Sequence, residues 1–161
     1  MAGMSRRTAA GLAAGVALAV LAADQASKGW ARADLPRGHL VTIVSGWLWF
    51  RRVSNSGATF GLLSGNNELF IVLSLVIVLA VGMLVFRSQA PGALGVSALG
   101  AIAGGGVSNL VDRVRFGSVT DFIIVPVWPT NFNLADAAVR IGVVLFIVAL
   151  LLEMRRDPRP G

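Results

Sequence analysis

The sequence predicts a membrane protein built as an all-α bundle of four transmembrane helices with a small β-sheet beside it. Of its 161 residues, 55% are hydrophobic and 14% are charged, whereas a soluble domain carries about 25% charged residues. The apolar residues collect in blocks of membrane-spanning length, and one span needs roughly 20 of them. A polytopic membrane protein follows from these two observations.

Four blocks are the predicted spans, over residues 8–30, 69–86, 92–111 and 134–152. The front half of the first block is similar to a signal peptide, with a basic start and a short apolar core. We interpret it as an uncleaved helix, because the apolar pattern continues through Asp24 and Lys28 to Trp30. The sequence contains no internal repeat or linker, which predicts a single domain over residues 1–161.

Residues 35–65 form the predicted β segment between the first two spans. Within it, HLVTIVSGWLWFRRV has β-branched residues, aromatic residues and partial alternation, which are typical of strands. The turn-rich stretch NSGATFGLLSGNN follows. A second extended piece, SVTDFIIVPVWP, connects the third and fourth spans. The aromatic side chains of the first piece suit a sheet at the membrane interface.

The net charge of +6 comes mostly from arginines that flank the apolar blocks. This placement indicates anchoring at the membrane surface and argues against a nucleic-acid partner. Four spans put both termini on one side, but basic residues are divided almost evenly, so charge favours cytoplasmic termini only slightly. Cysteine is absent and His39 is the single histidine, so we expect no disulfide, no thiolate catalysis and no metal site built on cysteine or histidine. We expect no metal and no cofactor.

Polar side chains gather at the end of the bundle away from the termini. Ionisable groups inside spans are rare and usually mark a function or a buried pair. Helical spacing of three or four residues places several of them on shared faces. The sets are Asp24 with Lys28, Asn109 with Asp112 and Arg113, Asn133 with Asp136 and Arg140, and Asp121 in the connection between the last two sets.

Two of these sets have a structural interpretation. Asp24 and Lys28 could form a helix-stabilising ion pair, with Lys28 extending toward the headgroups. Asp112 and Arg113 could form an orienting pair that fixes the end of the third span, and we favour this over catalysis.

Asp121 and Asp136 leave two interpretations open. Asp136 could be a first-turn carboxylate favoured by the helix dipole, and Asp121 a turn residue before a strand. Alternatively, the two carboxylates lie close together, one retains its proton near neutral pH, and the pair activates water against a carbonyl group. Spacing alone does not select this pair over Asp112 or Asp24.

Five ordered motifs resemble those of the lipoprotein signal peptidase family, also called signal peptidase II. The resemblance covers nearly the whole chain. Thr59 departs from it, since the family commonly has alanine there. The motifs are D-Q-x-S-K from Asp24, N-S-G-A-T-F-G from Asn55, G-G-x-x-N-L-x-D-R from Gly105, V-x-D-F from Val119 and F-N-x-A-D from Phe132.

The resemblance implies a bacterial aspartyl peptidase of the cytoplasmic membrane, with cytoplasmic termini and an extracytoplasmic β-sheet cradle near the active site. It implies diacylglyceryl-modified prolipoproteins as substrates, cleaved on the N-terminal side of the lipidated cysteine, and inhibition by the peptide antibiotic globomycin. Membrane lipids are the other expected partner, and we expect a monomer.

The family's motif positions also imply roles for individual residues. The catalytic pair falls on Asp121 and Asp136, whereas Asp112 remains a structural ion-pair residue. We further expect Arg113 to stabilise charge near the pair. The positions implied to contact substrate or inhibitor are Asp24, Lys28, Asn55, Gly57, Asn109, Arg113 and Asn133.

Two other classes of protein remain as alternatives. A small proton- or ion-coupled transporter also carries intramembrane acids and amides, but it predicts polar residues spread through the membrane depth. A non-enzymatic assembly factor would leave the clustered acids unexplained.

Overall fold

The computed structural model describes residues 4–57, 66–87 and 90–156. Within them, four helices are long and apolar enough to cross a membrane: α1 (Arg6–Asp34), α2 (Asn67–Phe86), α3 (Gly92–Phe116) and α4 (Leu134–Arg156). The predicted fold class is confirmed. Each predicted span lies inside one helix, and α1 and α3 continue beyond it to include the polar ends of these helices.

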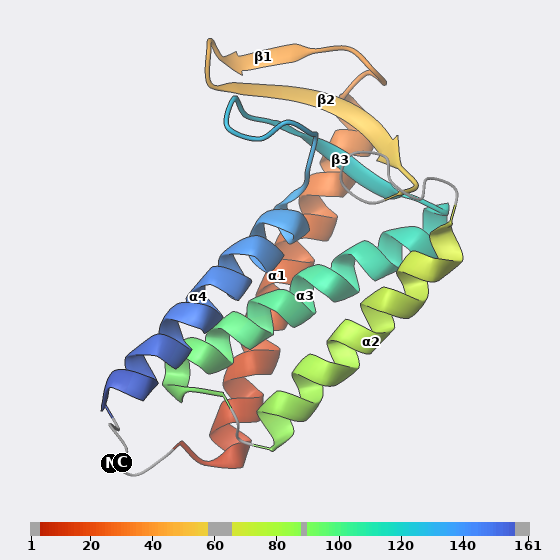
Figure 1. Ribbon diagram of the computed structural model, residues 1–161. Helices are drawn as coiled ribbons and strands as arrows, with labels where there is room; N and C mark the ends of the chain where they lie inside the picture. Colours follow the sequence, from red (N-terminus) through yellow and green to blue (C-terminus); the bar gives the residue numbers. More distant parts are fainter. Residues whose placement is uncertain (1–3, 58–65, 88–89, 157–161) are drawn as a thin grey trace.

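A three-stranded antiparallel sheet lies at one end of the bundle (Figure 1). Its strands are β1 (Val41–Val44), β2 (Leu48–Asn55) and β3 (Val119–Ile124), in the order β1-β2-β3. The β segment predicted over residues 35–65 supplies β1 and β2, and the piece before the fourth span supplies β3. Most of the turn-rich stretch after β2, including Thr59, lies outside the described residues.

Helix α3 occupies the centre of the bundle, where glycines allow close approach of its neighbours (Figure 1). A Cβ atom added at Gly104 would lie 2.5 Å from the carbonyl oxygen of Ala17 in α1. One added at Gly105 would lie 2.6 Å from the carbonyl oxygen of Ala135 in α4. Small residues are how membrane helices gain contact area without a hydrophobic driving force. They bring the polar ends of α1, α3 and α4 together.

An aromatic cluster joins the sheet to the end of α1. The ring centroid of Phe50 in β2 lies 5.6 Å from those of both Trp30 and Phe122, in edge-to-face geometry. Phe122 in β3 is 3% exposed. Such pairs contribute about 0.5–1.5 kcal/mol beyond the burial of their area. The cluster therefore holds β3, which carries Asp121, over the open end of the bundle.

Candidate active site

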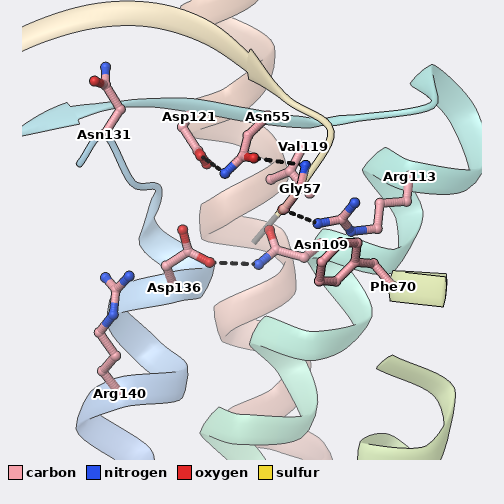
Figure 2. Close-up of a pocket in the computed structure, with 10 residues that line it drawn as sticks. All are labelled: Asn55, Gly57, Phe70, Asn109, Arg113, Val119, Asp121, Asn131, Asp136 and Arg140. Atoms are coloured by element: carbon pink, nitrogen blue, oxygen red, sulfur yellow. Dashed lines mark hydrogen bonds between the residues drawn. The ribbon is translucent and has the colours of Figure 1, made fainter. Parts of the chain in front are cut away.

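Asp121 and Asp136 line one cavity of about 190 Å³ between the sheet and the helix ends (Figure 2). Asp121 lies within β3 and is 1% exposed, so the alternative of a turn residue before a strand is wrong. Asp136 lies in the first turn of α4 and is half-buried. The remaining lining residues are Asn55, Gly57, Phe70, Asn109, Arg113, Val119, Asn131 and Arg140.

Three asparagine side chains donate hydrogen bonds to the two carboxylates. Asn133 Nδ2 lies 2.6 Å from Asp121 Oδ1, and Asn55 Nδ2 lies 2.9 Å from Asp121 Oδ2. Asn109 Nδ2 lies 2.8 Å from Asp136 Oδ1. Asp121 thus has a donor on both oxygens, whereas Asp136 has one on Oδ1. The second oxygen of Asp136 accepts no hydrogen bond from another described residue.

Each asparagine is oriented by a donor bound to its own carbonyl oxygen. The Asp136 backbone N–H donates to Asn133 Oδ1 over 2.8 Å, and the Gly57 N–H donates to Asn55 Oδ1 over 3.0 Å. Lys28 Nζ donates to Asn109 Oδ1 over 2.7 Å. Because an amide has an acceptor end and a donor end, these contacts direct the NH₂ groups at the carboxylates.

The environment of Asp121 favours its protonated form. The pKa of Asp121 is raised from 3.8 to about 7, chiefly by burial and also by the negative charge of Asp136. The hydrogen bonds from Asn55 and Asn133 and the charge of Lys28 oppose this rise in pKa. Removal from water dominates because the low dielectric around a buried carboxyl disfavours its charge.

Lys28 lies behind the cavity and is 0% exposed. Its Nζ lies 2.7 Å from Asp24 Oδ2 and 3.5 Å from Asp112 Oδ2. The ion pair between Asp24 and Lys28 is present, but the expected extension of Lys28 toward the headgroups is wrong, since two acids and Asn109 bind it inside the bundle. Asp24 and Lys28 do not line the cavity, which favours a supporting role over substrate contact.

Asp24 and Asp112 each bind the backbone next to one of the paired acids. The Ala135 N–H donates to Asp24 Oδ1 over 2.8 Å, immediately before Asp136. The Thr120 N–H donates to Asp112 Oδ2 over 2.9 Å, immediately before Asp121. The first amides of a helix have no partner within the helix, so Asp24 completes the start of α4. Because Lys28 contacts both Asp24 and Asp112, it connects the residues that hold the backbone beside Asp136 and Asp121.

Arg113 belongs to the cavity wall and not to an ion pair with Asp112. Its Nη2 donates to the Gly57 carbonyl oxygen over 3.1 Å, and its guanidinium carbon lies 4.5 Å from the Phe70 ring centroid. The expected Asp112–Arg113 pair is therefore wrong, because helical geometry turns these neighbours to different faces. Asp112 pairs instead with Lys28 and, over 3.4 Å, with Arg32.

Two residues that bind the acids behind the cavity were not identified from the sequence. Ser108 Oγ donates to Asp24 Oδ2 over 2.7 Å, and Gln25 Nε2 donates to Asp112 Oδ1 over 3.1 Å. Gln25 is a named position of the first quoted motif, which was a signal, whereas Ser108 falls at a variable position of the third motif and gave none. Asn133 is 0% exposed and lies beneath the cavity, where it contacts Asp121 and the backbone of Asp136.

A family model described as signal peptidase (SPase) II matches residues 16–152. The chain belongs to the signal peptidase II family. The resemblance drawn from the five motifs is thereby confirmed, and the chain is a peptidase. This membership also decides against the transporter and assembly-factor alternatives.

Sequence relatives and solved structures agree with this membership. A lipoprotein signal peptidase of Syntrophomonas wolfei subsp. wolfei is 37% identical and is matched over 88% of this chain and 94% of the relative. One of Moorella thermoacetica is 35% identical over 89% of this chain and 97% of the relative. A bacterial membrane enzyme solved by the in meso method at 2.3 Å has a TM-score of 0.84 and 27% identity, covering 94% of both chains.

Among the described residues of this signal peptidase II, no group of three or more His, Cys, Asp or Glu side chains is placed to hold a metal ion. The chemically competent groups around the cavity are carboxylates, amides and guanidinium groups. Such a set can transfer protons and bind a peptide backbone.

Proposed function

We propose that this chain is an aspartic-type membrane endopeptidase acting on diacylglyceryl-modified prolipoproteins. It cleaves on the N-terminal side of the lipidated cysteine and releases the signal peptide. The observation that carries the proposal is the placement of Asp121 and Asp136 in one cavity, each held by oriented amide donors. The names of the relatives support the substrate class.

The two carboxyls divide the acid and base roles. Asp136, with a free oxygen, takes a proton from water as the water oxygen bonds to the scissile carbonyl carbon. Asp121, whose pKa is raised to about 7 by burial, donates its proton to the carbonyl oxygen. When the tetrahedral intermediate collapses, the amine nitrogen takes the proton from Asp136, the C–N bond breaks, and one hydroxyl of the intermediate returns a proton to Asp121 as the new carboxyl group forms. Two carboxyls in one site favour this asymmetry because they resist double ionisation.

Four of the implied binding residues are placed to contact the substrate backbone: Asn55, Gly57, Asn109 and Arg113 line the cavity. A peptide amide left unpaired at membrane depth costs several kcal/mol, so polar lining lowers the cost of bringing it there. Arg113 adds positive charge near the pair and stabilises charge that develops on the substrate. Globomycin would occupy the same cavity.

The arrangement in the membrane follows from the bundle. The start of α1 and the end of α4 lie at the end opposite the sheet (Figure 1), and we place that end in the cytoplasm of a bacterial cell. The cavity then lies near the extracytoplasmic face of the cytoplasmic membrane, where the acyl chains of the substrate stay in lipid. In this proposal residues 1–161 act as one domain and the chain acts as a monomer.

Cleavage of a diacylglyceryl-modified prolipoprotein by the purified protein in detergent tests the proposal. Asp121→Asn and Asp136→Asn should each abolish cleavage, because each keeps the shape of the side chain but removes the carboxyl group. Asp34→Asn is the matched control, since Asp34 is an exposed acid at the end of α1. It should leave cleavage unchanged.

Folding and specificity need separate readouts. Both inactive variants should elute as wild-type protein and melt cooperatively. A prolipoprotein without the diacylglyceryl group should resist cleavage by wild-type protein. Substantial activity in either variant would refute the assignment of the catalytic pair, and equal cleavage of the unmodified substrate would refute the substrate class.

A further inference from the structure

Arg140 stands where the polar cavity meets a second, apolar cavity. The second cavity has a volume of about 260 Å³ and lies between α2, α3 and α4. The two cavities share Asn109, Asp136 and Arg140. The other lining residues of the apolar cavity are Ser74, Ile77, Ile102, Gly106 and Val139. Ile77 is 49% exposed on the outside of the bundle, so this cavity adjoins the lipid.

The guanidinium group of Arg140 is held by aromatic rings. Its central carbon lies 4.1 Å from the Trp128 ring centroid and 5.6 Å from that of Phe132. Among the described residues it forms no ion pair within 4.0 Å, and Oδ1 of Asp136 accepts a hydrogen bond from Asn109. Aromatic rings occupy the faces of a guanidinium group and leave its in-plane N–H donors available.

Figure 2 shows the guanidinium group of Arg140 near Asp136 at the edge of the polar cavity. A cationic side chain at membrane depth is costly unless its donors are bound. Arg140 makes no side-chain hydrogen bond among the described residues, so its donors can bind an acceptor that reaches the boundary between the polar and the apolar cavity. A fatty-acyl ester has this chemistry, because its carbonyl oxygen accepts hydrogen bonds and its chain is hydrocarbon.

We propose that Arg140 binds the ester oxygens of the substrate's diacylglyceryl group, with one acyl chain in the apolar cavity between α2, α3 and α4. This inference rests on the proposed function. The scissile bond adjoins the lipidated cysteine, so the ester groups lie between the bond at Asp136 and the acyl chains. The two joined cavities present groups in the same order as the substrate. The carboxylates correspond to the scissile bond, Arg140 to the ester groups and the apolar wall to the acyl chain.

A double-mutant cycle, with one change in the enzyme and one in the substrate, tests this contact. The two substrates are a prolipoprotein with a diacylglyceryl group and one with a dialkylglyceryl group, whose ether oxygens replace the ester carbonyls. Arg140→Gln should raise KM for the ester substrate by about tenfold or more, as expected for losing hydrogen bonds from a charged donor. For the ether substrate the same variant should change KM by less than about twofold.

The assay uses dodecyl maltoside, so that the substrate is the only source of acyl ester. Arg140→Lys should give an intermediate KM for the ester substrate, since it keeps the charge but loses the fork of donors. Arg155→Gln, a variant of an exposed arginine at the far end of α4, should match wild-type protein. Melting temperatures of all variants identify any loss of folding.

Two results would overturn the proposal. One is an equal rise in KM for the ester and ether substrates, which would assign Arg140 to the peptide or to the charge balance of Asp136. The other is an unchanged KM for the ester substrate in Arg140→Gln. Failure of the proposed function looks different, because wild-type protein would then cleave neither substrate.

Discussion

Replacing Asp121 by asparagine removes an ionisable group from the centre of the buried amide network, and stability should respond in a pH-dependent way. In the wild-type protein the pKa of Asp121 is raised from 3.8 to about 7, chiefly by burial. Below about pH 4 the folded and unfolded chains both carry the proton. As pH rises toward 7, the unfolded chain loses this proton before the folded chain does. The free energy of unfolding therefore falls progressively with pH.

The size of this effect follows from the two pKa values. The difference between 3.8 and about 7 corresponds to roughly 4 kcal/mol, because each pKa unit is worth about 1.36 kcal/mol. The wild-type protein should therefore lose about 4 kcal/mol from this group between pH 4 and pH 8. Asp121→Asn should lack that loss. The variant is predicted to be catalytically inactive and yet less sensitive to alkaline pH.

The assay is unfolding in dodecyl maltoside from pH 5 to pH 8, followed through the fluorescence of the four tryptophans. The informative quantity is the free energy of unfolding of Asp121→Asn minus that of wild-type protein at each pH. This difference should rise with pH. The altered hydrogen bonds of the asparagine add a constant to the difference but do not change its dependence on pH. Asp34→Asn serves as the control and should follow the wild-type curve. Parallel curves for Asp121→Asn and wild-type protein would refute the reasoning.

Four further outcomes are expected. The value of kcat/KM should fall above about pH 7, where Asp121 loses its proton, as a cleavage assay across pH will measure. Asp112→Asn should lower the free energy of unfolding by about 3 kcal/mol, because it leaves buried cations under-compensated; an inactive variant of wild-type heat stability would contradict its structural role. Gly105→Val should lower stability, since its Cβ would lie 2.6 Å from a carbonyl oxygen of Ala135, whereas Gly106→Ala, with its nearest contact at 3.4 Å, should keep wild-type stability in thermal unfolding. Cleavage should persist in EDTA, and a loss that zinc or magnesium restores would contradict the carboxylate mechanism.

The helices were predictable because each is defined by local composition. An apolar block of about 20 residues is the signal for a span wherever it folds, and all four blocks lie in helices. The ends of α1 and α3 were underestimated because polar residues there pair inside the bundle. Strand-like segments were also visible, but the register of Val53 opposite Asp121 joins residues far apart in the chain. No local pattern specifies such a pairing.

The candidate site shows the same limit at the level of single contacts. The spacing of Asp24 and Lys28 correctly places them on one helix face, but the contact of Lys28 with Asn109 spans 81 residues. Arg113 follows Asp112 directly, and its partners, Gly57 and Phe70, lie on other segments. The family resemblance identified residues that are distant in the sequence, which the spacing within one segment did not do. It could do so because the motifs of a family mark positions that the fold brings together.

The buried acids that pair with Lys28 hold the backbone beside Asp136 and Asp121, which come from distant segments. A buried ion pair is weak evidence for stability, since apolar residues of similar size often serve as well. Here the carboxylates do more than neutralise Lys28: Asp24 binds the backbone before Asp136, and Asp112 binds the backbone before Asp121. An apolar replacement would fill the space but would bind neither backbone N–H. The network therefore positions the backbone beside both acids, which an apolar core of the same volume would not do.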